Sequence, residues 1–393
     1  MANTSVPRQI IQPQGSPIDI RPTLLRDVGV AKLRALGSAL ELGPETTACA
    51  LSLFDRMTGA SCSAPIGDQP PWPNDITDDG TPFEFSIALR PGGVELRFLL
   101  ESQCAPVTST SSWEAGLAMQ RELGALGLVD VERFQRIVDL FVPDASAQPR
   151  FSLWHAGVIR KGCAPLIKAY LNPRVRGAVA APGLVAEALS RLGLDSAWRH
   201  LRQVTGSSRA LDMRYFALDL EASDSARVKV YVASSEAAPH LERLLKGVAN
   251  FRPGQATDFL TGLIGHPGPF PARPVLCCFA FVAGQAVPRA TLHVPVRCYV
   301  DDDSQALERV AAMLPSTVSL PLARAIQGFA SRPLSVGRGL ITYISFTPSD
   351  RGLRVTAYLA PEAYTISAPR QRLRGSSREL PSSDELEALV SSR

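Results

Sequence analysis

Runs of alternating apolar and polar residues recur in pairs along the chain, and a short segment rich in turn residues separates the two runs of each pair. Alternation with a period of two is typical of a strand that buries one face, and two such runs joined by a turn predict a β-hairpin. The pattern therefore predicts five hairpins, at 83–90 with 94–101, 151–160 with 165–172, 213–221 with 226–233, 275–283 with 290–300, and 338–346 with 352–360.

Segments with helical spacing lie between these hairpins. They include Glu114 to Leu126, Leu184 to Leu192, Ala237 to Val248 and Gln305 to Leu314. The unit of helix, strand, strand and helix returns about every 60–70 residues, and a repeat of this length is typical of stacked or closed units rather than of independent domains. We therefore expect a single domain over 21–366, preceded by a flexible segment at 1–20 and followed by a tail at 367–393.

The two faces of the predicted strands differ in kind. In 227–232 one face is valine throughout and the other is Arg, Lys and Tyr, and the runs at 166–171, 296–300 and 354–359 follow the same scheme. A half-exposed sheet is the alternative, but its solvated face normally mixes both charge signs, whereas these polar faces carry cations with almost no acid beside them. If the valine faces pack on helices, the polar faces converge on a lumen. The prediction is an α+β fold, a ten-stranded antiparallel β-barrel surrounded by a ring of helices.

Composition supports a folded chain with a large core. The 393 residues are 45% hydrophobic and 20% charged, and the net charge of +4 is too small to indicate binding to nucleic acid or to a membrane surface. The seven cysteines form no C-x-x-C pair, so neither a disulfide framework nor a zinc site is expected, and a reducing, cytoplasmic location fits best. No secretory signal pattern opens the chain, and its longest apolar run falls well short of the about 20 residues that cross a bilayer.

A cationic lumen lined with tyrosines suits an allylic diphosphate. Arginine and lysine bind diphosphate oxygens through charge-assisted hydrogen bonds, and tyrosine rings attract the allyl cation that ionisation leaves. With several cations present, no metal is required to neutralise the leaving group. The acidic run Asp301-Asp302-Asp303 resembles an aspartate-rich magnesium motif, but its place just before a helix favours helix capping.

An ordered set of segments resembles the aromatic prenyltransferases of the dimethylallyltryptophan synthase type. The segments are 78–86, 167–173, 218–220 with 227–231, and 342–346 with 355–359. The resemblance covers about residues 24 to 365 and implies the ABBA barrel of that family, built from five ααββ-like repeats. It also implies no metal cofactor, a prenyl diphosphate as co-substrate, and a monomer or homodimer without nucleic-acid or membrane partners.

The resemblance also assigns roles to residues. Glu84 corresponds to the glutamate that hydrogen-bonds the indole N–H, and His155 stands where relatives place a lysine that accepts the ring proton. Arg214 lies near the position that can bind an amino-acid carboxylate, although strand parity turns it toward the helices. The expected diphosphate ligands are Arg97, Lys168, Arg227, Lys229, Arg297 and, at a looser match, Arg354. The expected tyrosine shield is Tyr170, Tyr231, Tyr299, Tyr343 and Tyr358.

The sequence thus predicts an enzyme that transfers a dimethylallyl group to an aromatic ring without a metal. Tryptophan or another indole is the expected acceptor, because a carboxylate aimed at an indole N–H suits that heteroatom. Tyrosine or a hydroxylated aromatic stays open as an alternative, since a phenol O–H can use the same glutamate. A non-catalytic barrel that binds an anionic aromatic or isoprenoid ligand is the rival from another class.

Overall fold

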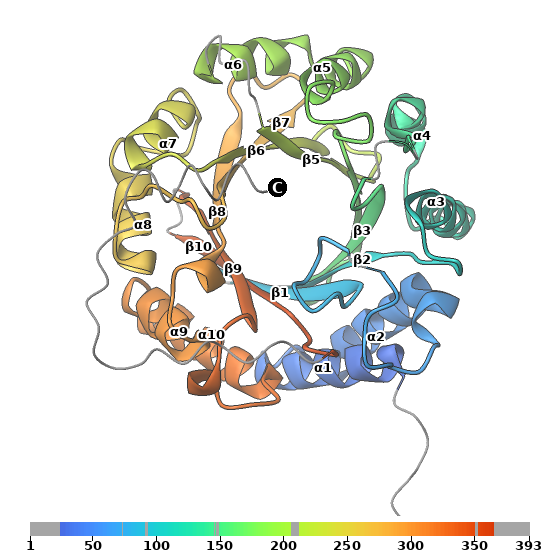
Figure 1. Cartoon of the computed structure of the whole chain (residues 1–393), viewed down its shortest axis with the longest axis vertical. Coiled ribbons are helices and arrows are strands. Elements are labelled where there is room, and N and C mark those ends of the chain that lie inside the picture. The colour runs from blue at the N-terminus through green and yellow to red at the C-terminus, as the bar shows by residue number, and fades with distance from the viewer. Residues whose placement is uncertain are drawn as a thin grey trace, which may run out of the picture.

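Ten antiparallel strands close into one barrel. The computed structural model describes residues 24–364 except 73, 91–92, 145, 147–148, 206–211 and 350–352. Around the barrel the strands follow the order β1-β10-β9-β8-β7-β6-β5-β4-β3-β2 (Figure 1). They are β1 (Phe83–Arg90), β2 (Gly93–Glu101), β3 (Leu153–Ile159), β4 (Leu166–Leu171), β5 (Asp212–Asp219), β6 (Arg227–Ser234), β7 (Val275–Val282), β8 (Arg289–Val294), β9 (Ile341–Thr347) and β10 (Arg354–Leu359). The predicted barrel is confirmed, while the segments 1–20 and 367–393 lie outside the described residues and the domain boundaries stay predictions.

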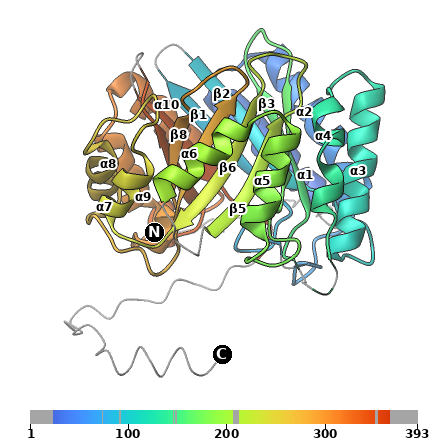
Figure 2. The ribbon, with the colours of Figure 1, turned by 90° about the horizontal axis from the view of Figure 1, so that it is seen from above.

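A pair of helices precedes each hairpin. The pairs are α1 (Leu25–Ala39) with α2 (Pro44–Thr58), α3 (Ser109–Ala125) with α4 (Glu132–Gln135), α5 (Ala181–Arg191) with α6 (Asp195–Thr205), α7 (Ala238–Leu244) with α8 (Gln255–Ile264), and α9 (Asp303–Ala312) with α10 (Ser316–Phe329). Figure 1 shows these helices as a ring outside the strands, and Figure 2 shows the same arrangement from above. The repeat unit is therefore two helices and two strands, five times over. None of the described helices is long and apolar enough to cross a bilayer.

The hydrophobic core fills the space between strands and helices. Val228 and Val230, on the outward face of β6, are fully buried there. On α2, the ring of Phe54 meets those of Phe83 and Phe98 edge-on, with centroids 5.3 Å apart in each case. Because the apolar faces of the strands pack against the helices outside the barrel, their polar faces line its interior.

The aspartates at the start of α9 have structural roles. The side chain of Asp302 accepts a hydrogen bond from the Gln305 N–H at 2.8 Å and caps the helix. Asp303 is fully buried and accepts the N–H groups of Gly339 and Ile341 at 3.1 and 2.9 Å. The predicted capping role is confirmed.

One strand ends earlier than its pattern predicts. The run at 290–300 forms β8 only as far as Val294, and Val296–Cys298 form a short 3-10 helix, η4. Pro295 stands at the break, and proline has no N–H to continue the hydrogen-bonded ladder. Residues after Pro295 therefore do not share the inward alternation of the strand.

Candidate active site

The inward residues of the strands line a cavity of about 230 Å³ inside the barrel. On β6 these are Arg227, Lys229 and Tyr231, and on β4 they are Lys168 and Tyr170. Five more of the predicted residues join them in the lumen wall, so ten of the predicted residues line the cavity; the five are Glu84, Arg97, Tyr343, Arg354 and Tyr358.

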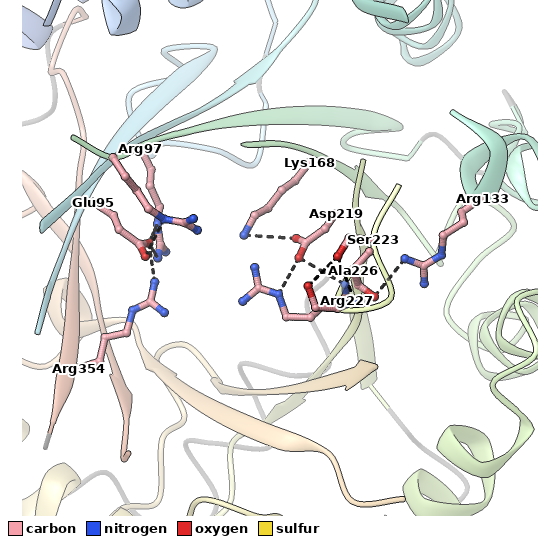
Figure 3. A network of polar contacts seen from close by, with 11 residues as sticks. Glu95, Arg97, Arg133, Lys168, Asp219, Ser223, Ala226, Arg227 and Arg354 are labelled. Carbon is pink, nitrogen blue, oxygen red and sulfur yellow. Dashed lines mark hydrogen bonds and ion pairs between the residues drawn. The ribbon is translucent and has the colours of Figure 1, made fainter. Parts of the chain in front are cut away.

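The cations gather at the end of the barrel where β6 and β10 begin. Five of them were predicted, and the structure adds Arg160 and Arg289, which no spacing pattern in the sequence singled out. Figure 3 shows Arg97, Lys168, Arg227 and Arg354 pointing toward one another across this end. We call it the cationic end.

Two buried carboxylates hold these cations in place, so the expectation of almost no acid among them is wrong. Glu95 is 4% exposed; its Oε2 accepts Arg97 Nε at 3.2 Å and Arg354 Nη2 at 2.6 Å, and its Oε1 accepts Arg160 Nε at 3.2 Å. Burial alone would raise the pKa of Glu95, but the cations, Arg97 foremost, outweigh it and lower the pKa to about 2.

Asp219 also holds cations in place, on the other side of the cationic end (Figure 3). Its carboxylate accepts Arg227 Nε at 2.6 Å and lies 3.5 Å from Lys168 Nζ. Burial opposes ionisation of Asp219, yet Lys168 and Arg227 hold its pKa below the usual range. Burial, and then the charge of Lys229, lower the pKa of Lys168 well below that of a free lysine. An incoming anion would favour the charged form of this lysine.

A collar of aromatic rings follows the cationic end along the lumen. The centroid of Tyr231 lies 6.2 Å from that of Tyr170, 5.6 Å from that of Tyr215 and 5.5 Å from that of His293. The His293 and Tyr358 centroids are 5.6 Å apart, and those of Tyr358 and Tyr343 are 6.4 Å apart. Sequence patterns missed Tyr215 and His293, because neither stands two residues after a cation on a predicted strand face.

Glu84 lies beyond the collar, at the end of the barrel where β1 begins. It lines the cavity, is 9% exposed, and burial raises its pKa to about 8. A flat apolar wall stands in the same part of the lumen, where the rings of Phe151 and Trp154 stack with centroids 3.9 Å apart. We call this region the acceptor chamber.

A second pocket, of about 380 Å³, adjoins the acceptor chamber. It shares Asp75, Tyr215, Leu276 and Tyr343 with the lumen and adds four arginines, Arg150, Arg174, Arg214 and Arg273. Arg214 lines this pocket because the register of β5 shifts between Met213 and Tyr215 and breaks the strand's alternation. The expectation that Arg214 faces the helices is therefore wrong.

His155 does not reach the lumen. It is fully buried on the outward face of β3, and its Nε2 lies 2.9 Å from Gln120 Oε1 on α3. Its neighbours Trp154 and Ala156 line the cavity instead. The structure contradicts a role for His155 as proton acceptor, because the strand's alternation turns the ring toward the helices.

Arg297 and Tyr299 also lie outside the lumen wall. Arg297 Nη2 donates to Asp78 Oδ1 at 2.6 Å, and the guanidinium carbon stands 5.3 Å from the Tyr343 ring centroid, at the end of the barrel opposite the cationic end. The Tyr299 hydroxyl donates to the Arg273 carbonyl at 2.5 Å and accepts the Arg273 N–H at 3.0 Å. Both predictions are wrong for the same reason, which is that β8 ends before Pro295.

A closed barrel with a cationic end, an aromatic collar and a buried carboxylate is suited to an anion and an aromatic ring held side by side. The family model of tryptophan dimethylallyltransferase matches residues 56–319, and the chain belongs to this family. It is an aromatic prenyltransferase, and the predicted transfer to an indole is confirmed at the level of the family. The comparisons do not favour the phenol acceptor or the non-catalytic barrel.

Solved structures agree with this assignment. The chain is 30% identical to 6-dimethylallyltryptophan synthase from Micromonospora olivasterospora, with 88% of this chain and 100% of that chain covered and a TM-score of 0.82. It is 31% identical to 5-dimethylallyl tryptophan synthase from Streptomyces coelicolor, with 91% of this chain and 100% of that chain covered and a TM-score of 0.80. Both structures contain DMASPP and Trp. AnaPT from Neosartorya fischeri is 16% identical over 86% of this chain and 95% of that chain, with a TM-score of 0.75, and shares the fold.

Proposed function

We propose that this chain transfers a dimethylallyl group from dimethylallyl diphosphate to the indole ring of tryptophan, without a metal. The observation that carries the proposal is the order of groups along one lumen. Cations stand at one end, aromatic rings in the middle, and a buried carboxylate with a stacked aromatic wall at the other end.

The cationic end would bind the diphosphate. Its proposed ligands are Arg97, Lys168, Arg227, Lys229 and Arg354, with Arg160 and Arg289 beside them. These cations outnumber the carboxylates of Glu95 and Asp219, so a net positive charge is left for an anion. Electrostatic stabilisation of this kind, preorganised before the reaction, lowers the barrier to breaking the C–O bond and substitutes for a metal.

The collar would hold the dimethylallyl cation. Tyr170, Tyr231, Tyr343 and Tyr358 line the lumen, and a tyrosine ring attracts a cation over its face by about 0.5–2 kcal/mol. The rings also exclude the water that would turn the cation into an alcohol.

The acceptor chamber would hold tryptophan. In this proposal Glu84 accepts a hydrogen bond from the indole N–H and makes the ring more nucleophilic. Arg214, with Arg174 and Arg273, faces the adjoining pocket and would pair with the carboxylate of the amino acid. This arrangement favours tryptophan over bare indole.

A direct test is incubation of the purified protein with dimethylallyl diphosphate and tryptophan in the presence of EDTA. We expect dimethylallyl-tryptophan by mass spectrometry, at a rate that chelation leaves unchanged. An Arg191→Ala variant, changed on an exposed helix face, should match the parent. Activity that disappears with EDTA and returns with magnesium would overturn the metal-free part. Cytoplasmic location and a monomeric or homodimeric state stay predictions.

A further inference from the structure

An imidazole stands in the aromatic collar. His293 lies on the inward face of β8, where its ring fits between those of Tyr231 and Tyr358 with centroids 5.5 and 5.6 Å away. Its partner across the ladder on β7, Leu276, lines both the lumen and the pocket beside the acceptor chamber. His293 therefore stands at the junction of the collar and the acceptor chamber.

The ring nitrogens of His293 are available to a ligand. Among the described residues no side chain or backbone group is hydrogen-bonded to either nitrogen, and the 8% of the residue that stays exposed faces the lumen it lines. His155 differs in each respect, since its Nε2 is engaged by Gln120 and its Nδ1 is sealed without a partner. Within the part of the chain that the structure describes, His293 is the one imidazole that lines the cavity.

Burial and the nearby cations keep the ring of His293 neutral. Burial, then Lys229 on β6 and Arg97 on β2, lower its pKa to about 3. The other groups that line the lumen beside it are the hydroxyls of Tyr231, Tyr358 and Ser345 and the thiol of Cys278. A bound diphosphate would offset the charges of Lys229 and Arg97, so the ring would be a stronger base while the diphosphate is in place.

We propose that His293 accepts the proton that leaves the substituted carbon of the acceptor ring. This inference rests on the proposed function. In the step, the C–O bond of the donor breaks with its electron pair on the diphosphate, and the ring carbon forms the new C–C bond. The C–H electron pair then returns to the ring as the proton passes to a nitrogen of His293. The imidazolium gives the proton to the diphosphate or to water as the products leave.

The carboxylates in and beside the lumen have other partners; Asp75, for example, lies 3.6 Å from Arg150 Nη1. Glu84 is placed on the indole N–H, and Glu95 and Asp219 are held in ion pairs with the cations. Burial raises the pKa of Tyr358 to about 12, so this phenol stays protonated and a poor base. His293 is the neutral acceptor that remains at the collar.

The test compares His293→Gln with the parent on tryptophan deuterated at its ring carbons. Loss of a general base typically costs 10²- to 10⁴-fold. We expect the single-turnover rate to fall about 100-fold and C–H cleavage to become rate-limiting, so that an isotope effect near one in the parent rises above two. In His293→Gly, added imidazole should restore part of the rate. His155→Gln, a buried histidine on the outward face, is the matched control and should show the parent's isotope effect.

Binding of the unreactive thiolo analogue of the donor checks that each variant is folded. A His293→Gln variant that binds the analogue and turns over with the parent's rate and isotope effect would overturn the proposal. If the parent prenylates phenols and not indoles, the proposed acceptor fails instead. The same comparison on a ring-deuterated phenol then decides the role of His293.

Discussion

Glu95→Gln should weaken the fold through the cationic end. Three guanidinium groups converge on this carboxylate, two on Oε2 and one on Oε1. A glutamine accepts at one oxygen only and turns its NH₂ group toward a cation. The pKa of Glu95 falls from 4.5 to about 2, and at 1.36 kcal/mol per pKa unit this corresponds to about 3 kcal/mol of interaction with its partners. Removal of one partner from a buried ion pair typically costs 3–5 kcal/mol, which agrees.

The assay is urea unfolding of the parent and the variant, with and without inorganic diphosphate. We expect a free energy of unfolding about 3 kcal/mol lower in the variant at pH 7. The folded pKa of Glu95 is depressed, so its contribution is complete above its unfolded pKa near 4.5 and is lost as the pH falls toward 2. The difference between parent and variant should therefore narrow at pH 3.

Diphosphate should stabilise the variant more than the parent, because the anion replaces the missing charge. Asp139→Asn, which breaks an exposed pair with Arg191, is the control and should leave unfolding unchanged. A variant as stable as the parent at pH 7, or one that gains less from diphosphate, would refute this account of the cationic end.

Two further predictions concern the acceptor. Because burial raises the pKa of Glu84 to about 8, kcat/KM of the parent should rise about tenfold per pH unit below pH 8, as the carboxylate that accepts the indole N–H forms. Glu84→Gln should lose this rise with pH and should lower the rate about 10- to 100-fold. A variant with the pH profile of the parent would contradict the role of Glu84. Arg214→Ala should raise KM for tryptophan about tenfold or more and leave KM for tryptamine, which lacks the carboxylate, unchanged. Equal effects on the two KM values would contradict the proposed ion pair between Arg214 and the carboxylate.

Strand alternation made most of the lumen predictable from the sequence. In β6 the valines face the helices and Arg227, Lys229 and Tyr231 face inward, because a period of two separates the faces wherever one of them is buried. The same rule places Tyr170 and Tyr358 correctly. The roles of these residues in binding and catalysis stay predictions.

The wrong predictions concern residues where the alternation of the strand breaks, and one residue whose position in the alternation already pointed outward. Pro295 ends β8, so Arg297 and Tyr299 leave the barrel although their spacing matches that of other strands. A register shift turns Arg214 toward the adjoining pocket. His155 could have been excluded, since its parity on β3 is opposite to that of Trp154. The roles of Glu95 and Asp219 depend on pairing between strands, which one sequence does not display.

The measurement that tests the central claim most directly is a crystal structure with the thiolo analogue of dimethylallyl diphosphate bound. The account predicts diphosphate oxygens within hydrogen-bond distance of Arg97, Lys168 and Arg227, and the dimethylallyl group among the rings of the collar. Diphosphate bound instead at Arg174, Arg214 and Arg273, in the pocket that adjoins the acceptor chamber, would contradict it.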